Sequence, residues 1–375
     1  AIRPATRHQV PGDIVCTMRF AVIMAGGAGT RRWPLSRKGT PKQLLRLIDG
    51  KSLLRIAFER LGDLVPPERV LICTGAPYAD QVRAELPEIP AENILGEPEG
   101  RDSLNAVAWP AAVIAARDGD AVIAQVTADQ LIEPVAVFTD ALARAFEVAE
   151  ADSSALVTLG VVPTSAHTGY GYLHRGDAVP GHEHTHRVIE FREKPDPVTA
   201  GEYLASGDYW WNAGMFVWRA ATFLEQLAAL HPVSHASVLE LAAHPERLAE
   251  IFPTLHKTSV DYGIMEPISA GAGTAHVLAV ALPVQWRDVG GYASLAEILT
   301  HDAAGNALIG SSVQLDCSGN VIINTAGDHL VGLLSCTGMV VVTTPTTTMV
   351  APLDQAERVR ELVALVRAEA GERYV

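Results

Sequence analysis

The sequence of 375 residues contains no long apolar run, and none of its stretches approaches the roughly 20 apolar residues that a membrane-spanning helix needs. We therefore expect no contact with a membrane. Residues 1–17 also lack the apolar centre of a signal peptide, because prolines and polar side chains interrupt them. We expect these residues to form a flexible N-terminal extension of a cytoplasmic protein.

Paired cysteines and an excess of positive charge are also missing. The four cysteines are scattered without a C-x-x-C pair, which favours reduced, packed thiols over disulfides. Lysine and arginine number 29 against 43 aspartates and glutamates, so the formal net charge is -14. Because proteins that bind nucleic acid present basic surfaces, we expect no nucleic acid partner.

Two familiar glycine motifs are absent. A dinucleotide fingerprint that used Gly27 and Gly29 would need a third glycine where Arg32 stands. A P-loop that ended at residues 50–52 would need a glycine at Leu45. These absences disfavour an NAD-dependent dehydrogenase and a P-loop protein.

What the sequence does contain is an apolar strand, a glycine turn and a cluster of cations in direct succession. Residues 20–24 are apolar, and the glycines at 26, 27 and 29 reach backbone angles that other residues adopt only at a cost. Without side chains, the N–H groups of such a turn can approach phosphate oxygens closely. No acidic residue interrupts the cations that follow, which are Arg31, Arg32, Arg37, Lys38, Lys42 and Arg46. A glycine pair alone would favour an ordinary tight turn, but with these cations the segment predicts a polyphosphate site.

The residues around these cations form a pattern that is more specific than a phosphate site in general. The segment reads G-G-A-G-T-R from residue 26, W-P-L-S-R from residue 33 and P-K-Q from residue 41. In this order it resembles the signature of sugar-1-phosphate nucleotidyltransferases, and its second half is similar to that of bacterial mannose-1-phosphate guanylyltransferases. The resemblance implies that Lys42 lies near the reacting phosphates. It also implies that the nucleoside triphosphate binds to Gly26, Gly27, Gly29, Thr30 and Arg31.

Strand and helix patterns alternate through the first two thirds of the chain. Apolar runs predict strands at 70–73, 121–126 and 155–159, and apolar periodicity predicts helices at 51–61 and from residue 103. This order predicts an α/β, mostly parallel Rossmann-like sheet with helices on both faces and ligands beyond the carboxyl ends of its strands. We expect this nucleotidyltransferase domain to span residues 18–301.

The pattern changes near residue 302, where short β-rich runs such as 321–324 and 339–343 alternate with turn-forming residues. We expect a C-terminal β-rich domain over 302–375 with a final helix at 354–368. The resemblance suggests left-handed β-helix turns, although no hexapeptide period is visible. Some relatives continue into a phosphomannose isomerase domain, which this chain is too short to include, so we expect one activity. We also expect a homodimer.

Two aspartates are candidate metal ligands. Asp129 follows the apolar strand at 121–126, and Asp288 stands in W-R-D-V-G from residue 286. Taken alone, Asp129 would be a turn former and Asp288 a helix N-cap. The resemblance implies that Asp129 binds the catalytic Mg²⁺, and Asp288 matches the aspartate of the family's W-x-D-V-G segment. Because carboxylate oxygens suit Mg²⁺, we expect both to bind it.

Four further segments resemble those that hold the sugar phosphate in the family. They are G-Y-G-Y from residue 169, F-R-E-K-P from 191, W-N-A-G-M-F from 211 and D-Y-G-I-M-E from 261. The resemblance implies that Lys194 holds the sugar 1-phosphate and that Glu193, Gly171 and Asn212 contact the sugar. Asp261 is either a sugar contact or a helix cap. Without the other motifs, Glu193 and Lys194 would be an exposed ion pair worth ~0–1 kcal/mol.

A nucleobase pocket is implied by E-P-E-G-R-D-S from Glu97, where relatives have E-P-x-G-R-N-T. Glu97, Gly100 and Arg101 match that pattern. Asp102 and Ser103 depart from it, which weakens the inference to guanine. With the signature, the resemblance implies GTP and mannose 1-phosphate as substrates. Another sugar 1-phosphate with UTP or dTTP, and a regulatory protein without catalysis, stay as alternatives.

The family reaction joins a sugar 1-phosphate to the α-phosphorus of a nucleoside triphosphate and releases pyrophosphate. A phosphate monoester has a second pKa of ~6, so the attacking oxygen is ionised at neutral pH without a general base. The enzyme must align two anions and neutralise developing charge. The resemblance gives this catalytic task to Arg31, Lys42 and Asp129.

A histidine cluster remains outside these motifs. His182, His184 and His186 could share one face of a strand and bind zinc. No cysteine or carboxylate completes a ligand set at a recognisable spacing, so a solvated loop is favoured.

Overall fold

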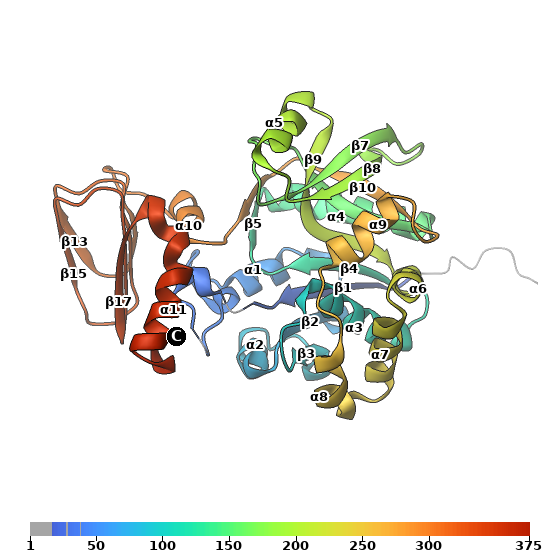
Figure 1. Ribbon diagram of the computed structural model, residues 1–375, viewed down its shortest axis with the longest axis horizontal. Coiled ribbons are helices and arrows are strands. Elements are labelled where there is room, and N and C mark those ends of the chain that lie inside the picture. The colour runs from blue at the N-terminus through green and yellow to red at the C-terminus, as the bar shows by residue number, and fades with distance from the viewer. Residues whose placement is uncertain (1–16, 28, 38) are drawn as a thin grey trace, which may run out of the picture.

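The computed structural model describes residues 17–27, 29–37 and 39–375. Apart from Thr17, the predicted N-terminal extension therefore lies outside the described residues. The chain forms a large α/β unit and a smaller β unit at its C-terminal end (Figure 1). The final helix α11 (Val359–Glu369) lies between the outer strands of the β unit and the rest of the chain (Figure 1).

A nine-stranded sheet forms the centre of the large unit. Its order is β3-β2-β1-β4-β9-β6-β10-β8-β7. The strands are β1 (Arg19–Ala25), β2 (Val70–Gly75), β3 (Ile94–Glu97), β4 (Val122–Thr127), β6 (Ala155–Val161), β7 (Gly171–Ala178), β8 (Thr185–Glu193), β9 (Tyr209–Arg219) and β10 (His276–Leu282).

The parallel arrangement holds for β3, β2, β1 and β4, and again between β6 and β10. Between these two groups β9 is antiparallel to both of its neighbours, and β7 and β8 form an antiparallel pair at the far edge. Within this sheet β8 and β9 run against the other seven strands, so the sheet is mostly parallel, as predicted. Because β1, β3 and β4 belong to one parallel group, their carboxyl ends share one edge.

Helices cover both faces of this sheet, as predicted. Along β1, Ala21 and Ile23 pack in one apolar core while Phe20 and Val22 pack in the other, because successive strand side chains point to opposite faces. One face carries α1 (Leu53–Glu59), α2 (Ala79–Glu85), α4 (Val135–Ala151) and α5 (Pro197–Ser206). The other carries α3 (Asp102–Arg117), α6 (Ala220–Leu230), α7 (Pro232–Ala243), α8 (Leu248–Ile251) and α9 (Glu266–Ser269).

The C-terminal β unit is a coil of strands that pair in parallel, except for the last strand, which is antiparallel to its neighbour. The sheets are β12-β14-β16-β17 and β13-β15. Their strands are β12 (Ala307–Ile309), β13 (Ser312–Leu315), β14 (Val321–Asn324), β15 (Val331–Leu334), β16 (Met339–Thr344) and β17 (Thr347–Pro352). The chain passes from one sheet to the other at each turn, and the turns use positive φ angles of 62° at Gly319 and 64° at Gly338. This architecture agrees with the predicted β-helix turns.

The β unit packs directly on the nucleotide signature. Trp33 and Leu35 share a buried apolar core with Tyr292 of α10 (Tyr292–Ile298), with β14 and β16, and with α11. Hence the signature lies at the junction of the two units. No helix in the described part of the chain is long and apolar enough to span a bilayer.

Candidate active site

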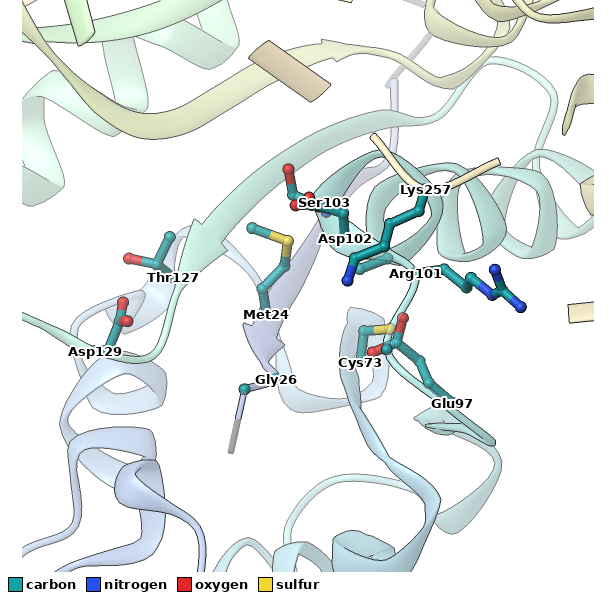
Figure 2. Close-up of a pocket in the computed structure, with 13 residues that line it drawn as sticks. Met24, Gly26, Cys73, Glu97, Arg101, Asp102, Ser103, Thr127, Asp129 and Lys257 are labelled. Atoms are coloured by element: carbon teal, nitrogen blue, oxygen red, sulfur yellow. Dashed lines mark hydrogen bonds between the residues drawn. The ribbon is translucent and has the colours of Figure 1, made fainter. Parts of the chain in front are cut away.

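A cavity of about 360 Å³ opens at the carboxyl ends of β1, β3 and β4. Asp129 and Thr127 lie at one end of it and Glu97 at the other, with Met24 and Gly26 between them (Figure 2). This is the edge at which the sheet topology predicts a ligand. The cavity is lined by Met24, Gly26, Gly27, Cys73, Glu97, Gly100, Arg101, Asp102, Ser103, Ala106, Thr127, Asp129 and Lys257.

The glycine turn follows β1 and leads into a short 3₁₀ helix at Thr30–Arg32. Gly27 and Gly29 have φ angles of 96° and 62°, in the left-handed region that favours glycine. Gly29 also packs closely, since an added Cβ would lie 2.9 Å from the Cβ of Lys42. The turn therefore requires glycine both for its backbone angles and for the approach of Lys42.

Two further contacts hold Lys42 beside the turn. The Ser36 hydroxyl donates to the Gly29 carbonyl. The buried amide of Gln43 donates to the carbonyl of Ala25, at the end of β1. The part of the signature around Lys42 thus folds back onto the glycine turn.

Lys42 and Asp129, both predicted catalytic residues, form an ion pair. Burial opposes ionisation of Asp129, but the Lys42 ammonium outweighs it with its charge and hydrogen bond, and the pKa of Asp129 is lowered. Asp129 is therefore a carboxylate at neutral pH. In this arrangement Lys42 lies on the carboxylate rather than free in the cavity.

Asp288 is brought to Asp129 by a strand pairing. It is the last residue of β11 (Gln285–Asp288), which runs antiparallel to β5 (Gln130–Glu133), and the N–H of Val289 donates to the Asp129 carbonyl over 3.0 Å. Burial and the charge of Asp129 raise the pKa of Asp288. The N-cap of α10 is Gly291, so Asp288 is not a helix cap.

The side chain of Arg31, in the signature segment, also lies close to Asp288. A Cβ added at Gly290 would lie 3.2 Å from Asp288 Oδ2 and 3.3 Å from Arg31 Nη1. The carboxylate and the guanidinium therefore flank this glycine. Three of the predicted residues, Arg31, Asp129 and Asp288, converge around one place in the fold.

The donor chemistry of this place fits Mg²⁺. Asp129 and Asp288 offer hard carboxylate oxygens, and an octahedral ion of this kind keeps positions for phosphate oxygens and water. Within the described residues, no group of three or more His, Cys, Asp or Glu side chains is arranged so that it could hold a metal ion by itself. The histidine cluster is no exception, because His182 and His184 precede β8 instead of sharing a face of it.

Arg32 is a residue whose place the sequence did not indicate. Its side chain is fully buried, and none of its three guanidinium nitrogens has a hydrogen-bond partner among the residues that the structure describes. Burial lowers its pKa to about 10, while the charges of Asp129 and Asp288 act in the opposite direction. Arg32 thus places a buried positive charge near both carboxylates.

The residues predicted to hold the sugar meet at the start of β7. A Cβ added at Gly171 would lie 2.4 Å from Glu193 Oε2 and 3.4 Å from the Cβ of Asn212. Asn212 donates to the Asp261 carboxylate over 3.0 Å. Gly171, Glu193, Asn212 and Asp261 therefore form one cluster.

Asp261 is the most perturbed carboxyl group of this cluster. It begins a π-helical turn, Asp261–Met265, in which no side chain caps the helix. Burial and the nearby Glu193 carboxylate raise the pKa of Asp261 to about 7. At neutral pH this side chain can therefore donate as well as accept a hydrogen bond, which suits a sugar hydroxyl.

Lys194 lies next to this cluster and has an unusual backbone conformation. Its φ of 51° lies in the left-handed region, and its N–H donates to the Tyr170 carbonyl over 3.2 Å. Its ammonium pairs with Glu193, and its side chain is more than half exposed. A strained backbone at an exposed cation is typical of functional sites.

An aromatic wall that the motifs did not predict joins the sugar cluster to the carboxylates. Tyr170 packs edge-on against Trp211 and Trp286, with ring centroids 5.2 and 4.7 Å apart, and stacks on His167 at 3.8 Å. Trp286 and Asp288 both belong to β11, so the wall continues into the proposed metal site. Burial raises the pKa of Tyr170 to about 12.

At the other end of the cavity, Glu97 ends β3 as a buried carboxyl group, 7% exposed. Its Oε1 has no hydrogen-bond partner in the described ranges, and burial raises its pKa to about 7. Gly100, a predicted nucleotide-binding residue, also lines the cavity. The Arg101 guanidinium is engaged by the Pro253 carbonyl and by Glu99.

Lys257 was not predicted from the sequence. It comes from the loop after the helical α8 region, and Figure 2 shows its side chain beside Arg101 and Asp102 at this end of the cavity. It belongs to no recognised motif, and its segment is distant from Glu97 in sequence. Only the folded chain places this cation at the cavity.

Two families of sequences match the chain in succession. The profile described as Nucleotidyl transferase matches residues 20–305. The profile described as MannoseP isomerase/GMP-like beta-helix domain matches residues 310–365. These ranges correspond to the large unit and to the C-terminal coil.

Individual relatives extend over both ranges. The chain is 37% identical to mannose-1-phosphate guanylyltransferase of Escherichia coli, over 95% of this chain and 76% of the relative. It is 35% identical to mannose-1-phosphate guanylyltransferase RfbM of Salmonella typhimurium, over 94% and 73% respectively. The crystal structure described as mannose-1-phosphate geranyltransferase from Thermus thermophilus is 34% identical, with a TM-score of 0.83, and the match covers 94% of this chain and all of that one. The chain therefore belongs to the nucleotidyl transferase family, and within it to the sugar-1-phosphate nucleotidyltransferases that its signature resembles.

Proposed function

We propose that this protein is a mannose-1-phosphate guanylyltransferase, which converts GTP and α-D-mannose 1-phosphate into GDP-mannose and diphosphate. Relatives with that name match almost the whole chain. The observation that carries the proposal is the ion pair of Lys42 and Asp129, in which Lys42 packs against Gly29 of the glycine turn. Next to Asp129, the Gln130 amide donates to the carbonyl of Ala213, which follows Asn212 of the cluster around Gly171. This arrangement would give one site a place for each of two phosphorylated substrates.

The base end of the cavity supports guanine. A carboxylate accepts two hydrogen bonds side by side, and guanine offers two adjacent donors, N1–H and the N2 amino group. Adenine has an acceptor at N1, and uracil and thymine flank their single N–H with two carbonyls. Glu97, with an oxygen free of partners in the described structure, is therefore suited to guanine. Hydrogen bonds from the base would favour its ionised form.

The chemistry needs alignment more than activation, because the sugar phosphate is already an anion. We assign the glycine turn and Arg31 to the triphosphate, and Lys42 to the phosphates that react. Lys194 holds the sugar phosphate while Glu193 and Asn212 hold hydroxyl groups. Asp129 and Asp288 would bind Mg²⁺, which when bound offsets the charge of the phosphates.

A grid of substrates tests the proposal. Pyrophosphate release is measured with four nucleoside triphosphates and several sugar 1-phosphates. We expect the highest kcat/KM for GTP with mannose 1-phosphate. A better pair elsewhere in the grid, such as UTP with glucose 1-phosphate, would refute the specificity, and no release with any pair would refute the reaction class.

A further inference from the structure

The C-terminal β unit holds the nucleotide signature from outside the catalytic domain. The indole N–H of Trp33 donates to the Tyr374 carbonyl over 2.6 Å. Within the catalytic domain, the buried hydroxyl of Tyr292 in α10 supports the same segment, 2.9 and 3.0 Å from the carbonyls of Arg32 and Trp33. These contacts hold the backbone immediately after Arg31.

Arg37 makes the most direct connection between the two units. Its Nη1 donates to Thr346 over 2.6 Å and its Nη2 to Thr344 over 2.7 Å, at the turn that joins β16 to β17. Its Nε donates to the Pro34 carbonyl over 3.0 Å, and burial lowers its pKa. The three guanidinium nitrogens of Arg37 thus bind the signature and the β unit to each other.

The held segment is the one that places Lys42. Next to Arg37, the Ser36 hydroxyl donates to the Gly29 carbonyl, and a Cβ added at Gly29 would lie 2.9 Å from the Cβ of Lys42. The backbones of Arg37 and Thr40 exchange hydrogen bonds of 2.8 and 3.1 Å. At its far end the segment is tied to β1 by Gln43. Arg37 and Trp33 therefore fix the middle of a segment whose two ends carry Arg31 and Lys42.

We propose that the C-terminal β unit is a clamp on the phosphate-binding segment, and that Arg37 is a positioning residue of the reaction. Glycine-rich turns lose more conformational entropy on ordering than other segments, so an external support lowers the cost of the bound arrangement. Catalytic groups also need second contacts that hold them within about 0.5 Å of their working positions. The proposal rests on the proposed function for its kinetic readout, but the order of the segment can be measured without any substrate.

The test compares Arg37→Met with Arg358→Met in the full chain. Arg358 is an exposed arginine of the same β unit that pairs with Glu361 and makes no described hydrogen bond to the signature. Arg37→Met should lower kcat/KM for the nucleotide about tenfold, as expected for the loss of one strong hydrogen bond, while KM for the sugar phosphate changes little. In Arg37→Met, hydrogen exchange should be faster than in the wild-type protein for peptides from residues 26–45, and it should stay unchanged in β1 and β16.

Two further variants separate positioning from folding. Thr346→Val removes the hydroxyl that accepts the hydrogen bond from Arg37. The loss of kcat/KM in the double variant should therefore be no larger than in Arg37→Met alone. Arg37→Lys, which keeps the charge and one donor, should recover part of the activity. Thermal unfolding of each variant shows whether the fold is kept.

The proposal is overturned if Arg37→Met matches Arg358→Met in both kinetics and exchange. It is also overturned if exchange accelerates throughout the protein and KM rises equally for both substrates, which would indicate general destabilisation. If the wild-type protein releases no pyrophosphate, the proposed function fails. Faster hydrogen exchange confined to residues 26–45 in Arg37→Met would then still support the clamp.

Discussion

Gly171→Ala should damage the sugar end of the site with little effect on the nucleotide end. The backbone of Gly171 is not in the left-handed region, so alanine is permitted there by its φ angle. The new methyl group would lie 2.4 Å from Glu193 Oε2 and 3.6 Å from the Arg192 carbonyl. The substitution therefore acts through the position of one carboxylate.

The size of the effect follows from these distances. Ordinary contact begins near 3.4 Å, so the carboxylate must retreat by about 1 Å from 2.4 Å. The Glu193 side chain is only 10% exposed and is paired with Lys194, which leaves little free space. A displacement of this size can cost on the order of 100-fold in rate. Overpacking should also cost about 1–3 kcal/mol of stability.

Steady-state kinetics with each substrate varied in turn checks this prediction. We expect kcat/KM for the sugar phosphate to fall by about 100-fold, with KM for the nucleotide nearly unchanged. Gly201→Ala is the matched control, because Gly201 lies in α5 with open space around it, and alanine there should be neutral or stabilising. If Gly171→Ala keeps the wild-type KM and kcat for the sugar phosphate, Glu193 does not bind the sugar.

Four other variants test the remaining parts of the site. Lys42→Ala and Asp129→Ala should each lower kcat by about 10²–10³ while the fold persists, since both side chains are partly exposed; near-normal turnover in either variant would contradict their catalytic assignment. Glu97→Gln should raise KM for GTP by about tenfold or more and weaken discrimination against other bases, and unchanged base selectivity would remove Glu97 from recognition. Asp261 has a pKa raised from 3.8 to about 7, so the folded protein retains a proton that the unfolded chain releases, and stability falls as pH rises between these values. Asp261→Asn should therefore reduce the fall in Tm between about pH 4 and pH 7, and an unchanged pH profile would show that Asp261 does not titrate in this range.

Features set by neighbouring residues were predictable from the sequence. Gly27 and Gly29 adopt the positive φ angles that their lack of a Cβ suggests. A continuous apolar run predicted β1, and β14 was predicted with the bounds that the structure shows. The order of the motifs also indicated a nucleotidyltransferase, because each motif is a short local arrangement with its own chemistry.

The C-terminal coil shows a repeat that a hexapeptide search did not reveal. Its turns at Cys317 and Cys336 are related by parallel pairing between β13 and β15, and Gly319 and Gly338 follow at equivalent positions. Because the coil turns differ in length and sequence, the period is longer and less regular than a hexapeptide. The pairing of the strands makes the correspondence clear.

Contacts between distant segments could not be predicted in this way. The antiparallel insertion of β9 in the sheet depends on pairings with β4 and β6, which no local pattern encodes. Nothing in the sequence near Arg32 indicated a buried guanidinium, and Lys257 belongs to no motif. These features arise from packing of elements that are far apart along the chain.

The sequence by itself therefore determined the chemical type of each group and the local shape that presents it, from the glycine turn to the paired aspartates. Tertiary structure alone decided which groups meet: Lys42 with Asp129, Gly171 with Glu193, and Arg37 with the C-terminal β unit. The physical reason is the range of the interactions. Backbone angles depend on adjacent residues, whereas ion pairs and packing depend on the positions that the whole sheet and both units impose.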